Sequence, residues 1–137
     1  MKYLVDANIL SEPTKPEPDE NVVRWLRVYE RELAVDPIVL GEIHIGVLSL
    51  APGRKRKRLE RWFESLARTV ECLPWESLVS QRWARLVVEM RKKGRTLPIL
   101  DSMIAATALQ HGLVLGTRNT VDFKKTGVSV VDPFIKM

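Results

Sequence analysis

The sequence is poor in cysteine and histidine and has no long hydrophobic run. Cys72 is the only cysteine in 137 residues, so no internal disulfide can form and a reducing, cytoplasmic compartment is expected. A lone cysteine with His44 and His111 does not make a spaced ligand set for structural zinc. No apolar run approaches the roughly 18 residues that span a bilayer, and an acid at position 6 comes too early for a secretory signal. A disulfide scaffold, a zinc-binding fold and a membrane partner are therefore not expected.

What the sequence does have is an excess of positive charge that gathers in two blocks. The 22 Lys and Arg residues exceed the 17 Asp and Glu residues, for a net charge of +5. RNA is a reasonable partner for basic surfaces, although solvated helix faces carry the same pattern. The candidates for contacts with RNA phosphates are Arg54, Lys55, Arg56, Arg58, Arg61, Lys92, Lys93 and Arg95.

Short apolar segments alternate with longer segments of helical periodicity. The length predicts a single domain over residues 1–137. Strands are expected at 2–5, 33–35, 70–73, 113–116 and 128–131, and helices from about 19 and over 37–50, 54–68, 76–93 and 98–111. This order predicts an α/β fold in which helices flank a central parallel sheet. Functional sites of such sheets lie beyond the carboxyl ends of the strands.

Three aspartates at the ends of these segments have both a structural and a functional interpretation. Asp6 closes the first strand and precedes a helical turn, where it can cap a helix. Asp101 lies in the first turn of a helix, where an acid suits the helix dipole. Asp122 can serve as a turn or capping residue. Each of these alternatives stays open on the sequence alone.

Glu42 is harder to explain by a structural role. It lies in a nearly wholly apolar helix and is expected to be buried, which costs several kcal/mol for an unpaired carboxylate. His44 does not face it, because residues two apart point in different directions on a helix. A divalent ion held jointly with Asp6 and Asp101 would compensate the charge. His44 and His111 are interpreted as surface or packed residues.

Carboxylates gathered in this way predict their own cofactor. Mg²⁺ and Mn²⁺ prefer hard oxygen ligands, and acids brought together without a cation repel each other. Such ions activate water and neutralise the charge that grows on a phosphodiester during hydrolysis. The acids therefore predict a metal-dependent nuclease.

Four segments of the chain resemble the PIN domain family, and most closely its VapC-type toxins of toxin–antitoxin pairs. They are residues 4–10 (LVDANIL), 40–46 (LGEIHIG), 98–108 (PILDSMIAATA) and 117–123 (TRNTVDF). The resemblance extends from Lys2 to Pro133. It implies a PIN fold and Mg²⁺- or Mn²⁺-dependent cleavage of RNA.

The resemblance also implies roles for individual residues. Asp6 and Asp101 match the principal metal ligands, Glu42 the acid of the second motif, and Asp122 a more variable fourth acid. Thr117 and Asn119 match polar residues of the family that line the same pocket as these acids. Relatives are usually homodimers silenced by an antitoxin. Many carry hydroxyl residues where this chain has Val39 and Asp36, although Asp36 can still cap its helix.

Other classes fit the sequence less well. A phosphoacceptor receiver domain needs an acidic pair early in the chain and a late lysine at a strand end, and this chain has neither. A dehalogenase-like phosphatase needs a second acid at position 8, which is Asn. A non-catalytic RNA-binding module would not need the four acids. A PIN-type RNA-processing nuclease without an antitoxin remains an alternative with the same chemistry.

Overall fold

The computed structural model describes residues 1–135 and contains a five-stranded parallel sheet. The spatial order is β3-β2-β1-β4-β5. The predicted parallel sheet is confirmed, and all five predicted strands are present, four of them shorter than predicted. Their bounds are β1 (Tyr3–Val5), β2 (Leu33–Val35), β3 (Glu71–Cys72), β4 (Val114–Gly116) and β5 (Val130–Val131).

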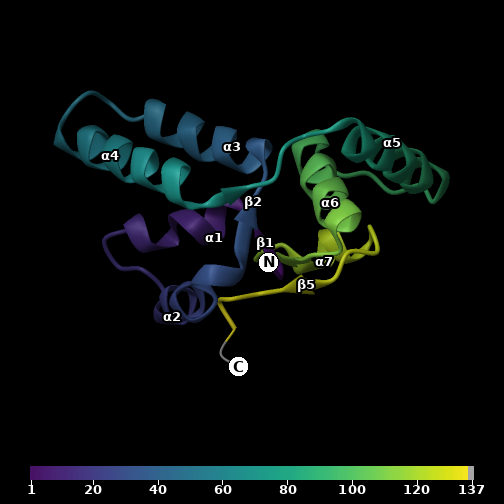
Figure 1. Ribbon diagram of the computed structural model, residues 1–137, viewed down its shortest axis with the longest axis horizontal. Helices are drawn as coiled ribbons and strands as arrows, with labels where there is room; N and C mark the ends of the chain where they lie inside the picture. The colour runs from purple at the N-terminus through teal and green to yellow at the C-terminus, as the bar shows by residue number, and fades with distance from the viewer. Residues whose placement is uncertain (136–137) are drawn as a thin grey trace.

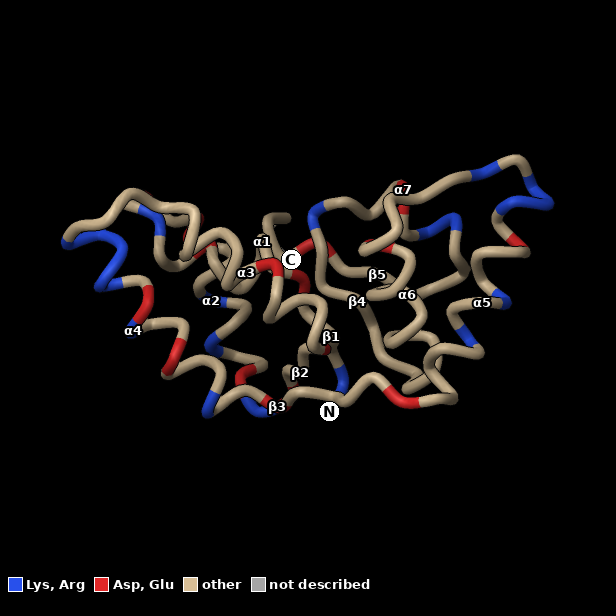
Figure 2. The backbone as a smooth tube through the Cα atoms, turned by 90° about the horizontal axis from the view of Figure 1, so that it is seen from above, with Lys and Arg blue, Asp and Glu red and all other residues tan. Residues whose placement is uncertain are grey.

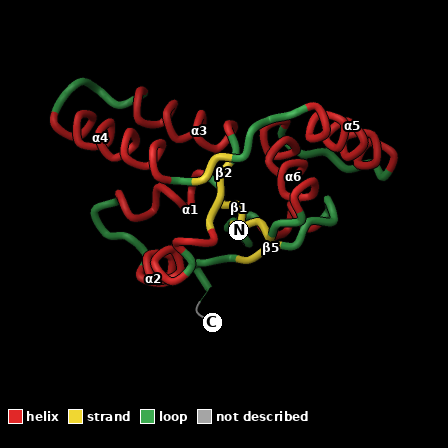
Figure 3. Tube along the Cα trace, in the orientation of Figure 1, coloured by secondary structure: helices red, strands yellow, loops and turns green. Residues whose placement is uncertain are grey.

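Helices cover both faces of this sheet. Helices α1 to α4 lie on one side and α5 to α7 on the other (Figures 1 and 3), as right-handed crossovers on a sheet that grows in both directions from β1 require. Their bounds are α1 (Ala7–Ser11), α2 (Glu20–Val28), α3 (Pro37–Leu48), α4 (Arg54–Thr69), α5 (Ser77–Lys92), α6 (Ile99–His111) and α7 (Thr120–Lys124), with short 3-10 helices η1 (Glu12–Thr14) and η2 (Glu30–Glu32). Among the described residues, no helix is long and apolar enough to cross a membrane.

The central strands form the core because helices bury them from both sides. Leu4, Val5 and Leu115 have no exposed surface. Trp25 of α2 packs over β4, where a Cβ atom on Gly116 would lie 3.1 Å from its ring. Gly116 therefore lets α2 approach the sheet closely.

Aspartates begin three of the four helices on the α1 side of the sheet. Asp6, Asp19 and Asp36 each accept a hydrogen bond from a backbone N–H in the first turn of α1, α2 and α3. The predicted cap at Asp36 is confirmed. So is the helix end at Gly112, which has a φ of 64°, a conformation that glycine adopts without strain.

One helix was not predicted. The sequence indicated a loop after β4 and, as the structural alternative for Asp122, a turn or capping residue, whereas the structure has α7 over Thr120–Lys124. A five-residue helix is too short to produce a helical periodicity in the sequence. Asp122 therefore lies on a helix that faces the carboxyl ends of the strands.

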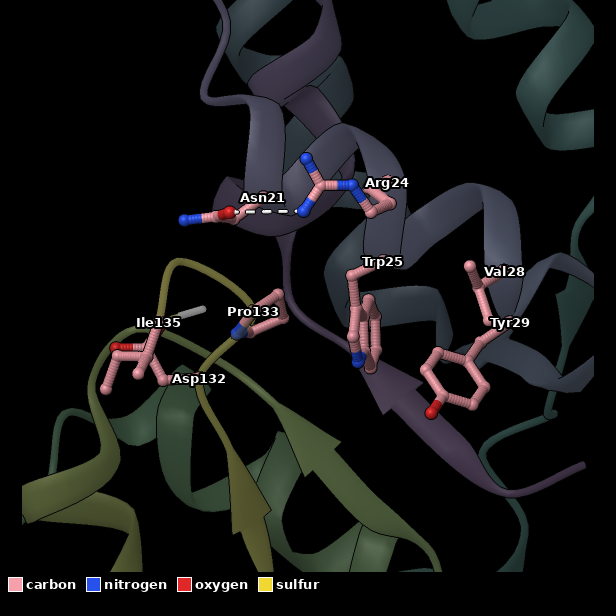
Figure 4. A pocket seen from close by; sticks show the side chains of 8 residues that line it. All are labelled: Asn21, Arg24, Trp25, Val28, Tyr29, Asp132, Pro133 and Ile135. Atoms are coloured by element: carbon pink, nitrogen blue, oxygen red, sulfur yellow. Dashed lines mark hydrogen bonds between the residues drawn. The ribbon is translucent and has the colours of Figure 1, made fainter. Parts of the chain in front are cut away.

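The segment after β5 lies against α2. Figure 4 shows Pro133 and Ile135 near Asn21 and Trp25 of that helix. The Asn21 side-chain amide donates a hydrogen bond to the Phe134 carbonyl at 3.0 Å. This contact places Phe134 next to the loop that follows β4.

Candidate active site

The carboxyl edge of the sheet carries a polar residue directly after each of its three inner strands. Asp36 follows β2, Asp6 follows β1 and Thr117 follows β4. Strands β2 and β3 lie on one side of β1, and β4 and β5 lie on the other, so the strand order reverses between β1 and β4. Ligands of open α/β sheets bind at such a switch point. The structure therefore places Asp6 and Thr117 where a site is expected.

Asp6 is fixed by its local structure. Its backbone N–H donates to the Gly116 carbonyl at 3.1 Å, and its Oδ1 accepts from the Ile9 N–H at 3.0 Å. Burial raises the pKa of Asp6, and the charge of Asp101 raises it further, while hydrogen bonds from Thr117 and the Ile9 N–H oppose this shift. The capping and functional interpretations of Asp6 are therefore compatible, because the cap orients the carboxylate.

Thr117 and Asn119 lie in the loop after β4. Thr117 is fully buried beside Asp6, and its Oγ1 accepts from the Asn119 N–H at 3.0 Å. Asn119 is exposed and precedes the first turn of α7. Thr117 is thus part of the floor of the site, and Asn119 lies at its rim.

Asp101 and Asp122 come from α6 and α7. Asp101 lies half-buried in the first turn of α6, and its pKa is raised by burial and then by the charge of Asp122. Asp122 is half-buried and lies 3.5 Å from Lys125 Nζ. This ion pair offsets part of the negative charge at the outer side of the site.

The expected burial of Glu42 is wrong. Glu42 is half-buried, because α3 leaves one apolar side uncovered and Ile45 on it is 64% exposed. Burial still raises the pKa of Glu42 more than any other cause, followed by the charges of Asp101, Asp6 and Asp36. Glu42 therefore belongs to the site through its neighbours rather than through deep burial.

Asp36 is a fifth acid whose contribution the sequence did not reveal. It has no exposed surface and accepts hydrogen bonds from the Val39 N–H at 3.0 Å and from Thr107 Oγ1 at 2.8 Å. Burial raises its pKa despite these bonds. Its position directly after a strand, like that of Asp6, was the signal that could have identified it.

The charges of the four predicted acids are linked through Asp101. Its charge raises the pKa of Asp6 and of Glu42, and the charge of Asp122 raises its own pKa. Within residues 1–135, no three Asp, Glu, His or Cys side chains lie close enough together to hold one metal ion. The cluster is thus an electrostatic unit and, among the described residues, not a preformed set of metal ligands. Its donor set, hard oxygens that repel one another, fits Mg²⁺ or Mn²⁺.

The basic blocks and the histidines lie mainly at the surface. Lys55 of the first block lines a groove together with Glu42. Figure 2 shows Lys and Arg at the outer end of α4 and at the far end of α5. Within these blocks, Arg56 forms an ion pair with Glu60, with 2.7 Å between Arg56 Nε and Glu60 Oε1. His44 is exposed and stacks on Phe63, with ring centroids 4.4 Å apart, and His111 is also exposed. The expectation of surface or packed histidines is confirmed.

Fold and site agree with one known family. The family model for the PIN domain matches residues 3–128, and the chain belongs to the PIN domain family. It is 33% identical over 135 residues to toxin FitB of Neisseria gonorrhoeae, covering 96% of this chain and 97% of FitB. It is 36% identical over 121 residues to ribonuclease VapC4 of Mycobacterium tuberculosis, covering 86% of each. The structure of FitAB bound to an IR36 DNA fragment matches with a TM-score of 0.92 and 31% identity, over 98% of this chain and 97% of that one. The resemblance to PIN-domain toxins is confirmed.

Proposed function

We propose that this chain is a Mg²⁺- or Mn²⁺-dependent endoribonuclease and the toxin of a toxin–antitoxin pair. The observation that carries the proposal is the set of acids around Asp101 at the switch point of a PIN-family sheet. Relatives that align over nearly the whole chain are named as toxin and ribonuclease. The compartment is the cytoplasm, and residues 1–137 act as a single domain.

The proposed ligands of the cation are Asp6, Asp101 and Glu42, assisted by Asp122. A divalent cation at these carboxylates polarises water and offsets the negative charge that grows on the phosphodiester. Asp6 is preoriented for this role by the Ile9 N–H. The raised pKa values of Asp6, Glu42 and Asp101 show that each carboxylate is under-compensated within this chain.

The remaining polar residues orient the ligands and the substrate. Thr117 stabilises the ionised form of Asp6, since its hydrogen bond lowers the pKa of that carboxyl. Asn119, exposed at the rim, is placed to contact the RNA. The basic residues of α4 and of the α5–α6 connection bind flanking phosphates, because phosphate contacts dominate the affinity for nucleic acid.

An antitoxin protein and a second copy of the chain are the proposed protein partners. FitB is a toxin, and its structural counterpart FitAB is a DNA-bound complex. The surface of this chain exposes large apolar residues suited to such contacts, among them Ile45 (64% exposed), Leu48 (48%), Ile99 (62%) and Leu100 (41%).

Two alternatives predict different behaviour. A PIN-type RNA-processing nuclease would show the same chemistry but would not be inhibited by a protein encoded beside it. A non-catalytic RNA-binding module would bind RNA without cleaving it. It would need no bound cation, so nothing would compensate the repulsion between its acids. The raised pKa values at the site favour the nuclease.

Cleavage of RNA by the Asp101→Asn variant tests the proposal. We expect wild-type protein with Mg²⁺ to cleave RNA, and the variant to lose at least about 100-fold in rate, the scale on which electrostatic stabilisation of a transition state acts. Glu89→Gln, an exposed acid of α5, is the matched control and should cleave like wild type. Full activity of Asp101→Asn, or of wild type in EDTA, would contradict the proposal.

A further inference from the structure

Glu12 is a buried carboxylate outside the acid cluster. Its exposed fraction is only 4%, and a buried charge is costly unless it is paired and hydrogen-bonded. Its Oε2 accepts from the Asp19 N–H at 2.9 Å, and its Oε1 lies 2.8 Å from Lys15 Nζ. The hydrogen bond with Lys15 is the main cause that lowers the pKa of Glu12. Glu12 is therefore ionised and forms an ion pair with the Lys15 ammonium. The Lys15 side chain stays 61% exposed.

A second cation, Arg118, is restrained by a different part of the chain. The charge of Arg118 also lowers the pKa of Glu12. The Arg118 guanidinium lies 4.2 Å from the centroid of the Phe134 ring, a distance at which a cation is attracted to an aromatic face. Phe134 is in turn held through its carbonyl by Asn21. Arg118 is thus exposed to solvent but restrained.

Both cations border the acid cluster. Lys15 lines a groove of about 310 Å³ together with Asn8 and Glu42. Arg118 directly follows Thr117, the residue after β4, and the Asp6 N–H donates to the Gly116 carbonyl at the end of that strand. Lys55 of the first basic block lines the same groove, while Figure 2 shows Lys and Arg also at the outer ends of α4 and α5. Lys15 and Arg118 lie beside the acids and are each restrained, Lys15 by the Glu12 carboxylate and Arg118 by the Phe134 ring.

We propose that Lys15, positioned by Glu12, and Arg118, positioned by Phe134, form a phosphate-binding pair for the RNA strand at the rim of the acid cluster. This inference rests on the proposed function and adds a substrate contact to it. Restraint by a buried carboxylate and an aromatic ring lowers the conformational entropy that two long side chains lose on binding.

The salt dependence of RNA binding tests the pair. Binding of a short single-stranded RNA is measured by fluorescence anisotropy in the Asp101→Asn background, which separates binding from cleavage. The double variant Lys15→Gln/Arg118→Gln removes two phosphate contacts. The negative slope of log K against log salt should therefore become shallower by about 1.4. The matched control Arg27→Gln/Arg85→Gln removes two exposed cations of α2 and α5 and should leave the slope unchanged.

The outcomes separate this inference from the proposed function. If Asp101→Asn does not bind RNA at all, the function as an RNA-binding nuclease is wrong. If it binds RNA and the Lys15/Arg118 variant has the same slope as its background, or the control loses as much, the phosphate pair is wrong and the function stands.

The positioning role of Glu12 has its own readout. Glu12→Gln keeps an acceptor for the Asp19 N–H but removes the charge. In otherwise wild-type protein we expect KM for RNA to rise about fivefold, about 1 kcal/mol of binding, with kcat within twofold. An unchanged KM, or a fall in kcat with KM constant, would overturn the positioning role.

Discussion

Removal of the central charge of the acid cluster should stabilise the metal-free protein. Asp101 raises the pKa of Asp6 and Glu42, so its replacement by Asn relieves repulsion that exists in the folded state. Two charges about 4 Å apart near a protein surface interact with about 4 kcal/mol. Asp101 and Glu42 are partly exposed, and solvent screening reduces the effect strongly. We expect Asp101→Asn to raise the free energy of unfolding at pH 7 by about 1 kcal/mol without metal.

The pH dependence of the free energy of unfolding is a second test of whether the acids repel one another in the folded state. Because the folded-state pKa values of Asp6, Glu42 and Asp101 are raised, the folded state binds more protons than the unfolded state above the normal values near 4. The free energy of unfolding therefore falls as the pH rises from about 4 through the raised pKa values. Asp101→Asn should show a smaller fall than wild type.

Urea unfolding in EDTA and in Mg²⁺, at pH 5 and pH 7, measures these effects. A ligand at about 100 times its Kd stabilises the folded state by about 2.7 kcal/mol, and Asp101→Asn should lose most of this gain. Glu89→Gln is the control and should stay within about 0.5 kcal/mol of wild type. The reasoning is refuted if Asp101→Asn is destabilised in EDTA, or if Mg²⁺ stabilises it as much as wild type.

Two further substitutions separate structural from chemical roles. Asp36→Ala removes the α3 cap and the partner of Thr107 and should cost about 1–3 kcal/mol of unfolding free energy in urea titrations; a cost below about 0.5 kcal/mol would contradict the described hydrogen bonds. His44→Ala should leave the rate of RNA cleavage within about twofold, because His44 stacks on Phe63 at the surface; a large loss in kcat would indicate that a histidine takes part in proton transfer.

Much of the fold could be predicted because strong local signals and the final structure agree. Buried apolar strands alternate with capped helices, and a residue directly after an inner strand must lie at the carboxyl edge of the sheet. This argument placed Asp6 correctly. Applied in the same way, it would also have singled out Asp36, which the sequence analysis treated only as a cap.

The errors concern side chains whose surroundings depend on packing. Glu42 was expected to be buried because α3 is apolar on almost every side, but composition does not tell which side the protein covers. Ile45 and Leu48 remain exposed, and Glu42 is only half-buried. Helix α7 is too short to leave a periodic signal. Glu12 carries no motif. Lys15 lies only three residues from it, but only the fold brings Arg118 against Phe134.

Titration of Mn²⁺ into wild-type protein and Asp6→Asn by calorimetry tests most directly whether the acids form one metal site. Asp6 combines a fixed orientation with a raised pKa, and Asn at this position can keep the cap while it loses the charge. We expect saturable binding to wild type and a loss of at least about tenfold in affinity for the variant, with fewer protons released on binding to the variant. Equal affinity for Mn²⁺ in the two folded proteins would contradict the metal site on which the proposed nuclease depends.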